Sequence, residues 1–600
     1  MLSFLVVWLC FACAFAKDCH FTLELTWNTG SPDGFEREMI FVNDQFPGPT
    51  LEIEQGDWVE IQVVNKMPFN TTVHYHGIEQ LNTPWADGVP GLTQRPIQPG
   101  ATYTYKWHAN QYGSYFYHAH SRGQIDDGLY GPIIVKPKAG IVKPFDRIAP
   151  AEVKLLEVAE QKIKPVILSD WRHTTSQRTW EIQLDSGVES ALCMDSLLVN
   201  GKGAVDCWSR EEIDKFTSPG IRPNLQQNNL TMTNKGCLPP EILELLLSQG
   251  TETNIDAIPP EVFDVCTPTQ GSREVIKAPH STNWLALDII STAGIDTFAF
   301  SIDEHPMWIY AVDGHYIEPL LVNALSIANG DRYSVFIRLD KPAGNYGIRL
   351  ASTALAQLID TTAVLSYEGG YGNYRNATDD ITVTSFPYTN QAGVNTTANV
   401  TFFQQARMKS FPPQFPQPAP EPDQTFILSL KTVGQSYIWA LNSTPFDHAI
   451  DDSSPPLLYQ PPVANNPGGN ITITTKNNTW IDLIFVVTTI NQPPHPIHKH
   501  SNKVFVIGQG QGSFNWSSVA EARRAIPQAF NLVTPPFRDG VATIPTTTGP
   551  TWLAVRYRVE NPGAFLIHCH IQSHLNGGMA MVILDGVDEW PEVPDEYKDV

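Results

Sequence analysis

Four His-x-His pairs recur along the chain, each with two histidines separated by a single residue. They are His74/His76, His118/His120, His498/His500 and His568/His570. On a β-strand, residues two apart project from the same face, so each pair directs two imidazoles into one volume. One such pair alone would be compatible with ordinary core or surface histidines. Four pairs predict a cluster of metal ions enclosed by four strands.

The last pair encloses a cysteine and is followed by two further candidate ligands. Cys569 lies between His568 and His570, and His574 and Met579 come later in the chain. Imidazole, thiolate and a weak thioether form the ligand set of a blue copper electron-transfer site. Because neighbouring side chains on a strand face opposite ways, the cysteine would bind one copper while the histidines beside it bind others. The backbone would then be a short electron path into the cluster.

Five segments resemble the multicopper oxidase family, and the resemblance runs from about His20 to Gly586. They are His74-Tyr-His-Gly77, Trp85-Ala-Asp-Gly-Val-Pro90, Tyr117-His-Ala-His-Ser121, His495-Pro-Ile-His-Lys-His500 and His568-Cys-His-Ile-Gln-Ser-His574. In the first domain, Phe46-Pro-Gly-Pro49 and Gly123-Gln-Ile-Asp-Asp-Gly-Leu-Tyr130 are similar to laccase-like enzymes of fungal pigment and polyketide pathways.

The resemblance implies four coppers per chain. The blue (type 1) copper would be held by His495, Cys569 and His574, with Met579 at the axial position. The single type 2 copper would be held by His74 and His498. The type 3 pair would be held by His76, His118, His120, His500, His568 and His570. The other seven histidines are interpreted as ordinary surface or core residues: His20, His108, His173, His280, His305, His315 and His448.

The implied reaction takes single electrons through the exposed edge of a ligand histidine and reduces O2 to water, which requires protons and therefore an acid near the cluster. Asp87 matches a carboxylate of the family at this place, although a turn residue before Gly88 is the alternative interpretation. Many family members carry a second acid three residues after the cysteine. This chain has Gln572 there, so either Asp87 serves alone or water and other groups compensate.

The N-terminal residues predict a secreted protein, extracellular or in the cell wall. Residues 2–13 are almost entirely apolar and Ala14-Phe15-Ala16 resembles a cleavage site, so 1–16 is interpreted as a signal peptide. The acidic segment after Leu584 and the lack of a later apolar run predict no membrane anchor. A net charge of −23 argues against nucleic acid as a partner. Nine sequons fit a glycosylated surface: Asn70, Asn229, Asn376, Asn395, Asn399, Asn442, Asn470, Asn477 and Asn515.

Five cysteines remain outside the signal peptide and the proposed copper site: Cys19, Cys193, Cys207, Cys237 and Cys266. In an oxidising compartment this odd number allows two disulfides and one free thiol, and the connectivity does not follow from the sequence. Resemblance to plant-type members of the family suggests that Cys19 ties the N-terminus to the second domain near Cys193.

A chain of 600 residues is expected to form several domains, and short β-rich runs separated by turn residues dominate this one. Gly113-x4-His-Ala-His120 recurs as Gly563-x4-His-Cys-His570, which suggests that the first and last domains are homologous modules. The resemblance implies an all-β fold of three cupredoxin-like Greek-key barrels with the cluster between the first and third. The predicted domains are 17–145, 146–400 and 425–600. The middle domain lacks a His-x-His pair and is expected to space the other two and help shape the substrate pocket.

Two segments interrupt this plan. An insertion at about 205–270 contains a predicted helix, Leu238–Leu247, which is a candidate wall of the substrate pocket. Residues 401–424 form a proline-rich linker, with six prolines from Phe411 to Gln424, and are expected to be extended.

The favoured function is a laccase-like oxidase whose small substrates are O2 and an electron-rich phenol. The phenol is expected to be a polyketide naphthol or naphthopyrone that couples into a dimer or pigment. Two alternatives remain open. One is oxidation of another small donor, such as ascorbate or ferrous iron, and the other is a copper-binding array without turnover. The complete set of ligands counts against the array.

Overall fold

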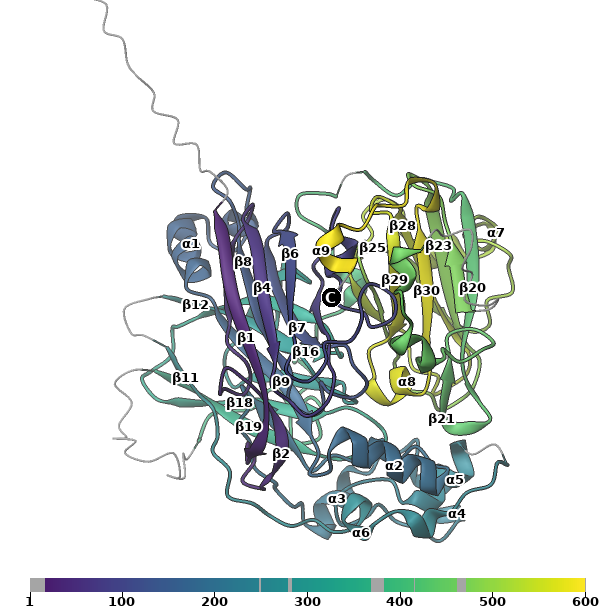
Figure 1. The fold of residues 1–600 in the computed structure, drawn as a ribbon. Helices are drawn as coiled ribbons and strands as arrows, with labels where there is room; N and C mark the ends of the chain where they lie inside the picture. Colours follow the sequence, from purple (N-terminus) through teal and green to yellow (C-terminus); the bar gives the residue numbers. More distant parts are fainter. Residues whose placement is uncertain are drawn as a thin grey trace, which may run out of the picture.

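The computed structural model describes residues 17–247, 250–278, 283–367, 383–414, 416–460 and 471–598. The predicted signal peptide, the sequons at Asn376 and Asn470, and His280 lie outside these residues. Figure 1 shows the first domain, in purple to blue, beside the third, in green to yellow. Within the described residues the strands form six sheets, two in each domain. The all-β class of three cupredoxin-like domains is therefore confirmed.

One sheet of each domain is built around two neighbouring parallel strands, followed by an antiparallel one. In the first domain the order is β2 (Arg37–Val42), β1 (Asp18–Gly30), β4 (Trp58–Asn65) and β6 (Thr102–His108). In the second it is β10 (Ser196–Val199), β9 (Lys164–Trp171), β12 (Trp284–Ser291), β17 (Arg332–Arg338), β14 (Met307–Val312) and β15 (His315–Val322). In the third it is β21 (Gln435–Ala440), β20 (Gln424–Val433), β23 (Trp480–Val487), β28 (Thr551–Arg558), β25 (Val504–Gln511) and β26 (Phe537–Arg538).

The other sheet also repeats one plan in all three domains. Its order is β3 (Leu51–Glu54), β8 (Tyr130–Lys136), β7 (Gly113–Ala119) and β5 (Val73–His76) in the first domain. It is β11 (Val275–Ala278), β19 (Asp360–Tyr367), β18 (Asn345–Ser352), β13 (Phe298–Ile302) and β16 (Ala324–Ile327) in the second. It is β22 (Thr472–Thr474), β30 (Ala580–Asp585), β29 (Gly563–Cys569), β24 (Pro496–Lys499) and β27 (Gly540–Ala542) in the third. The strands β7 and β29, which carry the repeated motif, hold equivalent places.

Burial patterns explain why these segments form strands and how the domains meet. In β4 buried residues alternate with more exposed ones, as expected for a strand with one face on a core. By contrast, β29 is buried along its whole length. Leu566 packs in a hydrophobic cluster with the core of the first domain, whereas Ile567 packs in a cluster formed by the second and third domains. The first and third domains therefore share one hydrophobic interface along β29.

Helices are short and several gather in one layer below the third domain, beside α8 and β21 (Figure 1). The layer contains α2 (Ser176–Ser186), α3 (Arg210–Phe216), α4 (Arg222–Gln227), α5 (Pro240–Leu247) and α6 (Pro260–Phe263). The remaining helices are α1 (Val153–Gln161), α7 (Val519–Ala525), α8 (Gln572–Asn576) and α9 (Asp595–Lys598). The helix predicted in the insertion is confirmed as α5, while α2 was not predicted. No helix in the described parts of the chain is long and apolar enough to cross a membrane.

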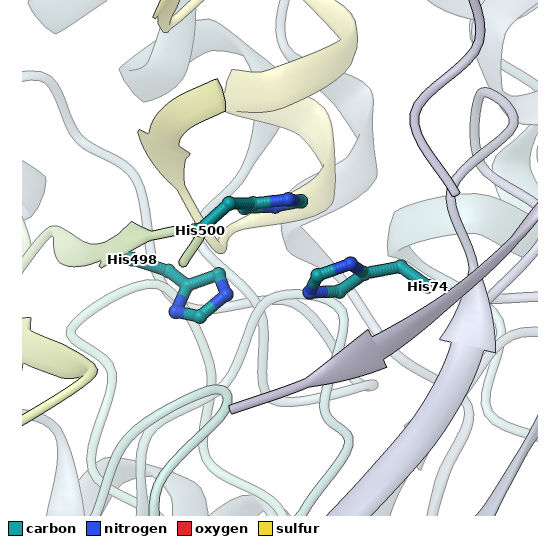
Figure 2. A group of neighbouring side chains, drawn as sticks. All are labelled: His74, His498 and His500. Carbon is teal, nitrogen blue, oxygen red and sulfur yellow. The ribbon is translucent and has the colours of Figure 1, made fainter. Parts of the chain in front are cut away.

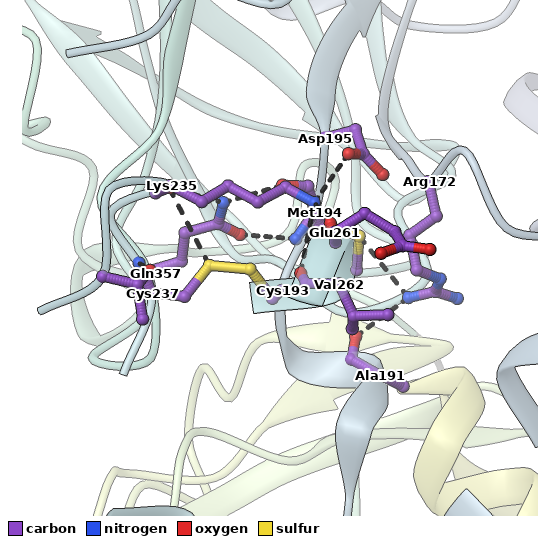
Figure 3. Close-up of a disulfide and its surroundings, with 11 residues drawn as sticks. Arg172, Ala191, Cys193, Met194, Asp195, Lys235, Cys237, Glu261, Val262 and Gln357 are labelled. Atoms are coloured by element: carbon purple, nitrogen blue, oxygen red, sulfur yellow. Dashed lines mark hydrogen bonds and ion pairs between the residues drawn. A yellow bond between two sulfur atoms is a disulfide. The ribbon is translucent and has the colours of Figure 1, made fainter. Parts of the chain in front are cut away.

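Two disulfides cross-link this helical layer: Cys193–Cys237 and Cys207–Cys266. Two disulfides with Cys19 left free are what the odd cysteine number allows, but the suggested pairing of Cys19 near Cys193 is wrong. Cys193 is buried in the core of the helical layer and already bonded, whereas Cys19 is a free cysteine on β1. Figure 3 shows the polar frame around the first disulfide, where the Gln357 side chain hydrogen-bonds the backbone N–H and carbonyl of Met194.

Two further predictions concern the surface and the domain limits. Within the predicted linker 401–424, a 3-10 helix spans Gln405–Arg407 and the described residues from 411 to 423 carry no strand and no helix, so the extended linker stays a prediction. The seven described sequon asparagines are all exposed or partly exposed. The sheets fall within 18–136, 164–367 and 424–585. The domain boundaries and the glycosylation remain predictions.

Candidate metal centre

The eight paired histidines come from two equivalent pairs of strands. In the first domain β5 and β7 pair antiparallel, with His74 opposite His118. In the third domain β24 and β29 pair antiparallel, with His498 opposite His568. The second histidine of each His-x-His pair lies on the same strand or directly after it. The matching registers show that the two outer domains present their histidines in the same way.

Histidines of the two domains meet across the shared interface. His74 stacks on His500 and His76 stacks on His498, each with ring centroids 3.8 Å apart. Figure 2 shows His74 reaching from the first domain toward His498 and His500 of the third. The candidate ligand atoms of these three residues lie within 4.8 Å of one another. Four further groups meet the same limit, and three of them contain paired histidines: His74/His76/His118, His120/His500/His568 and His76/His498/Asp539. All eight paired histidines except His570 thus belong to a metal-binding group, and the His570 ring lies 4.9 Å from His76.

Backbone carbonyl groups orient four of these rings. Nδ1 donates a hydrogen bond of 2.7–2.9 Å from His74 to the Asp87 carbonyl, from His118 to Ala119, from His498 to Asp539 and from His568 to Cys569. A carbonyl oxygen only accepts, so Nδ1 carries the hydrogen and Nε2 presents its lone pair. Nε2 is buried without a partner among the described residues in His74, His118, His120 and His498, as are both ring nitrogens of His76 and His570. Buried lone pairs without partners are costly, so this donor set fits bound metal ions.

Burial also favours the uncharged form of several paired histidines. It lowers the pKa of His568 to about 4. Burial, together with the neighbouring imidazoles, holds the pKa of His118 and His500 well below the ordinary 6.5. Neutral imidazole is the form that binds a metal. The interface therefore prepares its ligands by excluding water.

The candidate blue site lies on the other face of β29. Sγ of Cys569 is 3.6 Å from Nδ1 of His574 and 3.9 Å from Nδ1 of His495, and all three side chains are buried. Met579 is also buried, and its carbonyl oxygen accepts a hydrogen bond from the Cys569 N–H. Burial raises the pKa of the Cys569 thiol above its usual range, so a cation is needed to hold it as a thiolate. These ligand types suit copper.

Glu189 is a candidate functional residue that the sequence analysis missed. Its Oε1 lies 3.4 Å from Nε2 of His574 and accepts a hydrogen bond from the Ser573 hydroxyl at 2.7 Å. Burial raises the pKa of Glu189 to about 7, against the lowering effect of that hydrogen bond. The expected exposed edge of a ligand histidine is not observed. His574 is only 1% exposed, because Glu189 meets its outer nitrogen and Trp439 packs on its ring at 4.0 Å.

Asp87 contacts ligands from both domains. Its Oδ2 accepts a hydrogen bond from Nδ1 of His500 at 2.8 Å, and its Oδ1 lies 3.4 Å from Nδ1 of His74. It also ends a short 3-10 helix before Gly88, whose φ of +83° and contact with the Val73 carbonyl leave no room for a side chain. Asp87 is therefore both a turn residue and a buried carboxyl group beside the candidate cluster.

Arg332 of the second domain joins all three domains next to the cluster. Its guanidinium bonds both carboxylate oxygens of Asp539 at 2.5 and 2.6 Å and the Ser114 carbonyl of the first domain at 3.1 Å. Oδ1 of Asp539 lies 3.5 Å from Nε2 of His76. Burial alone would raise the pKa of Asp539, but Arg332 and Lys503 outweigh burial and hold that pKa well below its usual range. The sequence pattern contained no sign of this ion cluster.

Further buried charges complete the junction. Arg538 donates to Asp313 at 2.7 Å and to Asp331 at 2.7 Å, and Lys503 donates to Asp539 at 2.5 Å. With Arg332, the three cations balance the three carboxylates. Gly330, with φ +85°, lies so close that an added Cβ would sit 2.8 Å from the His76 ring. The second domain, although it carries no ligand pair, therefore supports ligands of the cluster.

The remaining histidines are kept apart from these groups. Among the described residues, none of the other six belongs to a group of three metal-binding side chains. His305, for example, bonds the Asp303 carbonyl and the Tyr367 hydroxyl in the second domain. The interpretation of these six as ordinary residues stays a prediction, and one of them, His448, lines a cavity together with His118 and His120.

Replacing Arg332 should weaken the contacts between the domains next to the cluster. Arg332→Met leaves the buried Asp539 with Lys503 alone, and breaking a buried pair costs about 3–5 kcal/mol of unfolding free energy. We expect the variant to lose stability in urea and to bind less than its full copper complement, because His76 and His498 lose a fixed neighbour. Arg556→Met is the matched control, since it breaks a buried pair with Asp482 inside the third domain only. Full copper binding by the Arg332 variant would contradict this role.

The buried histidines should make the metal-free protein sensitive to acid. In the unfolded chain each histidine titrates near 6.5, whereas folding lowers the pKa of His568 to about 4 and that of His495 to about 3. Between these values the unfolded state binds more protons, so stability falls as the pH decreases, by about 1.4 kcal/mol per pH unit for each such histidine. Urea unfolding of the copper-free protein at pH 7 and pH 5 measures this loss. Equal stability at both values would exclude it.

Comparisons with known proteins agree with this geometry. Three multicopper oxidase family models match residues 24–140, 162–370 and 447–589. The chain is 43% identical over 591 residues to "Laccase abr2" of Aspergillus fumigatus, covering 97% of each chain. The fold is similar to the laccase from Botrytis aclada (TM-score 0.69, 24% identity, 97% and 90% of the two chains). It is also similar to Fet3p, a multicopper oxidase that functions in iron import (TM-score 0.69, 19% identity, 97% and 94%).

The matched regions cover most of the chain and contain all the candidate ligands. At the identities found, the two solved structures support the fold alone, whereas the family models and the relative from Aspergillus fumigatus extend through the ligand-bearing segments. The chain belongs to the multicopper oxidase family, whose members are copper-dependent oxidoreductases with four coppers and O2 as the electron acceptor.

Proposed function

We propose that the protein is a secreted laccase-like oxidase that removes single electrons from electron-rich phenols. The observation that carries this proposal is the buried carboxyl group of Glu189 at the outer nitrogen of His574. A phenol loses a proton as well as an electron when it becomes a phenoxyl radical. A carboxyl group beside the electron-accepting histidine supplies a place for that proton.

The proposed ligand assignment follows the family pattern. The blue copper would be held by His495, Cys569, His574 and Met579, the type 2 copper by His74 and His498, and the type 3 pair by His76, His118, His120, His500, His568 and His570. When bound, the blue copper accepts single electrons and the other three reduce O2 to water. Asp87 is proposed to hold a proton for that reduction, since its carboxylate contacts His500.

Glu189 and His574 are both buried, which separates the two parts of the phenol reaction. An electron can pass through a layer of protein from a donor bound at the surface near these two side chains. A proton needs a hydrogen-bonded route. Such a route would end at Glu189, whose carboxylate then holds the proton. The segment that carries Glu189 is backed by the insertion, because Val188 packs in one hydrophobic cluster with Ile242 and Leu243 of α5. The insertion therefore packs behind the segment that carries Glu189. This contact refines the role expected for the insertion, which was to form a wall of the substrate pocket.

The competing donors differ in what they require of the protein. Ferrous iron releases no proton, so its oxidation would make no use of a proton acceptor beside His574. Among the described residues, Glu189 is the only acid in contact with His574. The similarity to a relative named as a laccase supports a phenol as the electron donor. We propose a polyketide naphthol or a related fused-ring phenol as the substrate, because delocalised radicals form at the modest potential that a thioether ligand such as Met579 would favour. Secretion and glycosylation belong to the same proposal.

The ligand role of Cys569 has a direct spectroscopic test. In Cys569→Ser the weakly coordinating hydroxyl replaces the thiolate, so the intense blue absorption and the oxidase activity are expected to disappear. The type 3 pair should still assemble, because His568 and His570 face the other side of β29. Copper analysis with visible and near-ultraviolet absorption measures both effects. A variant that stays blue would refute the assignment.

The substrate class is tested by comparing the oxidation of two different electron donors by the wild-type enzyme and by one variant. Glu189→Gln removes the proton acceptor and should slow oxidation of a dihydroxynaphthalene about a hundredfold, the lower end of the range for a lost general base. Oxidation of ferrocyanide, which gives an electron without a proton, should keep its rate. Glu160→Gln is the matched control, a buried glutamate of α1 far from His574 in the fold.

Two outcomes would count against the phenol proposal. One is equal slowing of dihydroxynaphthalene and ferrocyanide in Glu189→Gln. The other is a wild-type kcat/KM for ferrous iron or ascorbate that exceeds the naphthol value by tenfold or more. Neither outcome would affect membership of the multicopper oxidase family.

A further inference from the structure

A cavity between the first and third domains reaches the candidate cluster. Its walls come from residues 118–123 of the first domain and from residues 446–451 and α8 of the third. His118 and His120 form part of its inner lining. His120 is also the one paired histidine that is partly exposed. The cavity therefore connects the surface with two of the eight paired histidines.

Reduction of O2 to two waters consumes four protons and four electrons. The electrons come from the donor, and in phenol oxidation the donor's protons are released on the other side of β29, near Glu189. Protons for water formation must therefore arrive by a separate route. Asp87, which contacts two ligands, does not line the cavity.

Few side chains of the cavity can exchange a proton. Apart from the two histidines already assigned to copper, its titratable lining residues are Arg122, His448 and Asp451. An arginine stays protonated in proteins and cannot pass a proton on. The amides of Gln572 and Asn576 do not titrate. His448 and Asp451 are the remaining candidates.

These two residues form a hydrogen-bonded pair at the edge of the cavity. Nδ1 of His448 lies 2.9 Å from Oδ2 of Asp451, and its Nε2 lies 2.9 Å from the Leu575 carbonyl oxygen on α8. Both partners are acceptors, so the ring fills both hydrogen bonds only when both nitrogens carry a hydrogen. The side chains are 12% and 24% exposed, which leaves contact with solvent. The pair thus touches both water and the cavity.

The surrounding charges are mixed. The titratable and charged groups around His448 are Asp447, Asp451 and Asp452 of its own segment, and His118, His120 and Arg122 of the first domain, which line the same cavity. Burial holds the pKa of His118 and His120 well below the ordinary 6.5. The His448–Asp451 pair differs from these ligands in position, because it is hydrogen-bonded and partly exposed at the edge of the cavity.

We propose that the His448–Asp451 pair takes up protons from solvent and donates them, through water in the cavity, toward the O2-reducing centre. In each cycle the ring Nδ1 or Nε2 gives one proton to a water molecule and regains one from bulk solvent, so the pair ends unchanged. Four such transfers balance the four protons consumed for each O2. This role concerns O2 reduction and does not depend on which donor supplies the electrons.

The proposal is tested in the copper-loaded enzyme by following the two half-reactions separately. His448→Gln keeps a polar side chain of similar reach but cannot exchange a proton at neutral pH. In stopped-flow at pH 7 we expect reoxidation of the reduced variant by O2 to be at least about tenfold slower, within the range for a lost proton donor. Reduction by the donor and the copper content should be unchanged. Added imidazole should restore part of the reoxidation rate.

His173→Gln is the matched control. This histidine also lies between acids, 2.8 Å from Asp33 and 3.5 Å from Asp195, and its side chain is 17% exposed. It does not line the cavity, so its substitution should leave both half-reactions at the wild-type rate. Asp451→Asn is the second variant, expected to slow reoxidation in the same direction but to a smaller extent.

A readout apart from turnover is the exchange of ring-carbon hydrogens in the intact enzyme, measured by mass spectrometry. His448 should exchange with deuterium faster than His305, which is 1% exposed. The proposal is overturned if His448→Gln reoxidises with the wild-type rate and pH profile. It is also overturned if donor reduction slows equally, or if the ring of His448 exchanges no faster than that of His305.

Discussion

The bidentate ion pair between Arg332 and Asp539 is the contact on which the candidate metal centre depends. It lies where all three domains meet, and both partners are almost completely buried. The cluster needs histidines from two separate domains, so its geometry is only as fixed as the interface between those domains. A buried pair is costly to break, because one unpaired charge remains inside the protein. The second domain therefore holds the outer domains in register without contributing a ligand pair.

Water exclusion at the same interface explains the state of the histidines. Hydrophobic contacts along β29 close the space between the first and third domains, and burial then keeps the imidazoles neutral. A neutral, partly unpaired set of ring nitrogens is unfavourable until a cation binds. Folding and metal binding are thus coupled, since the packing that removes water also creates the need for the metal.

How much was predictable from sequence depended on the range of each interaction. The strand period was enough to place Cys569 and His568 on opposite faces, because that relation is local. The clustering of four His-x-His pairs followed from repetition. Arg332 and Glu189 could not be found in this way, since each acts on a ligand in another domain and neither belongs to a repeated pattern. The pairing expected for Cys19 failed for the same reason, because disulfide partners are set by tertiary structure.

The arrangement around β29 separates electrons from protons. In the proposed ligand assignment, Cys569 and its neighbouring histidines would provide a covalent path for electrons through the strand, whereas protons cannot follow it and need polar side chains or water. The two sides of the strand differ accordingly. Glu189 lies beside the blue-site ligand His574, and the His448–Asp451 pair lies at the cavity that leads to His118 and His120. Proton release and proton uptake are opposite transfers, and in these proposals they take place at different side chains: Glu189 beside Ser573 of α8, and His448 beside the Leu575 carbonyl of the same helix.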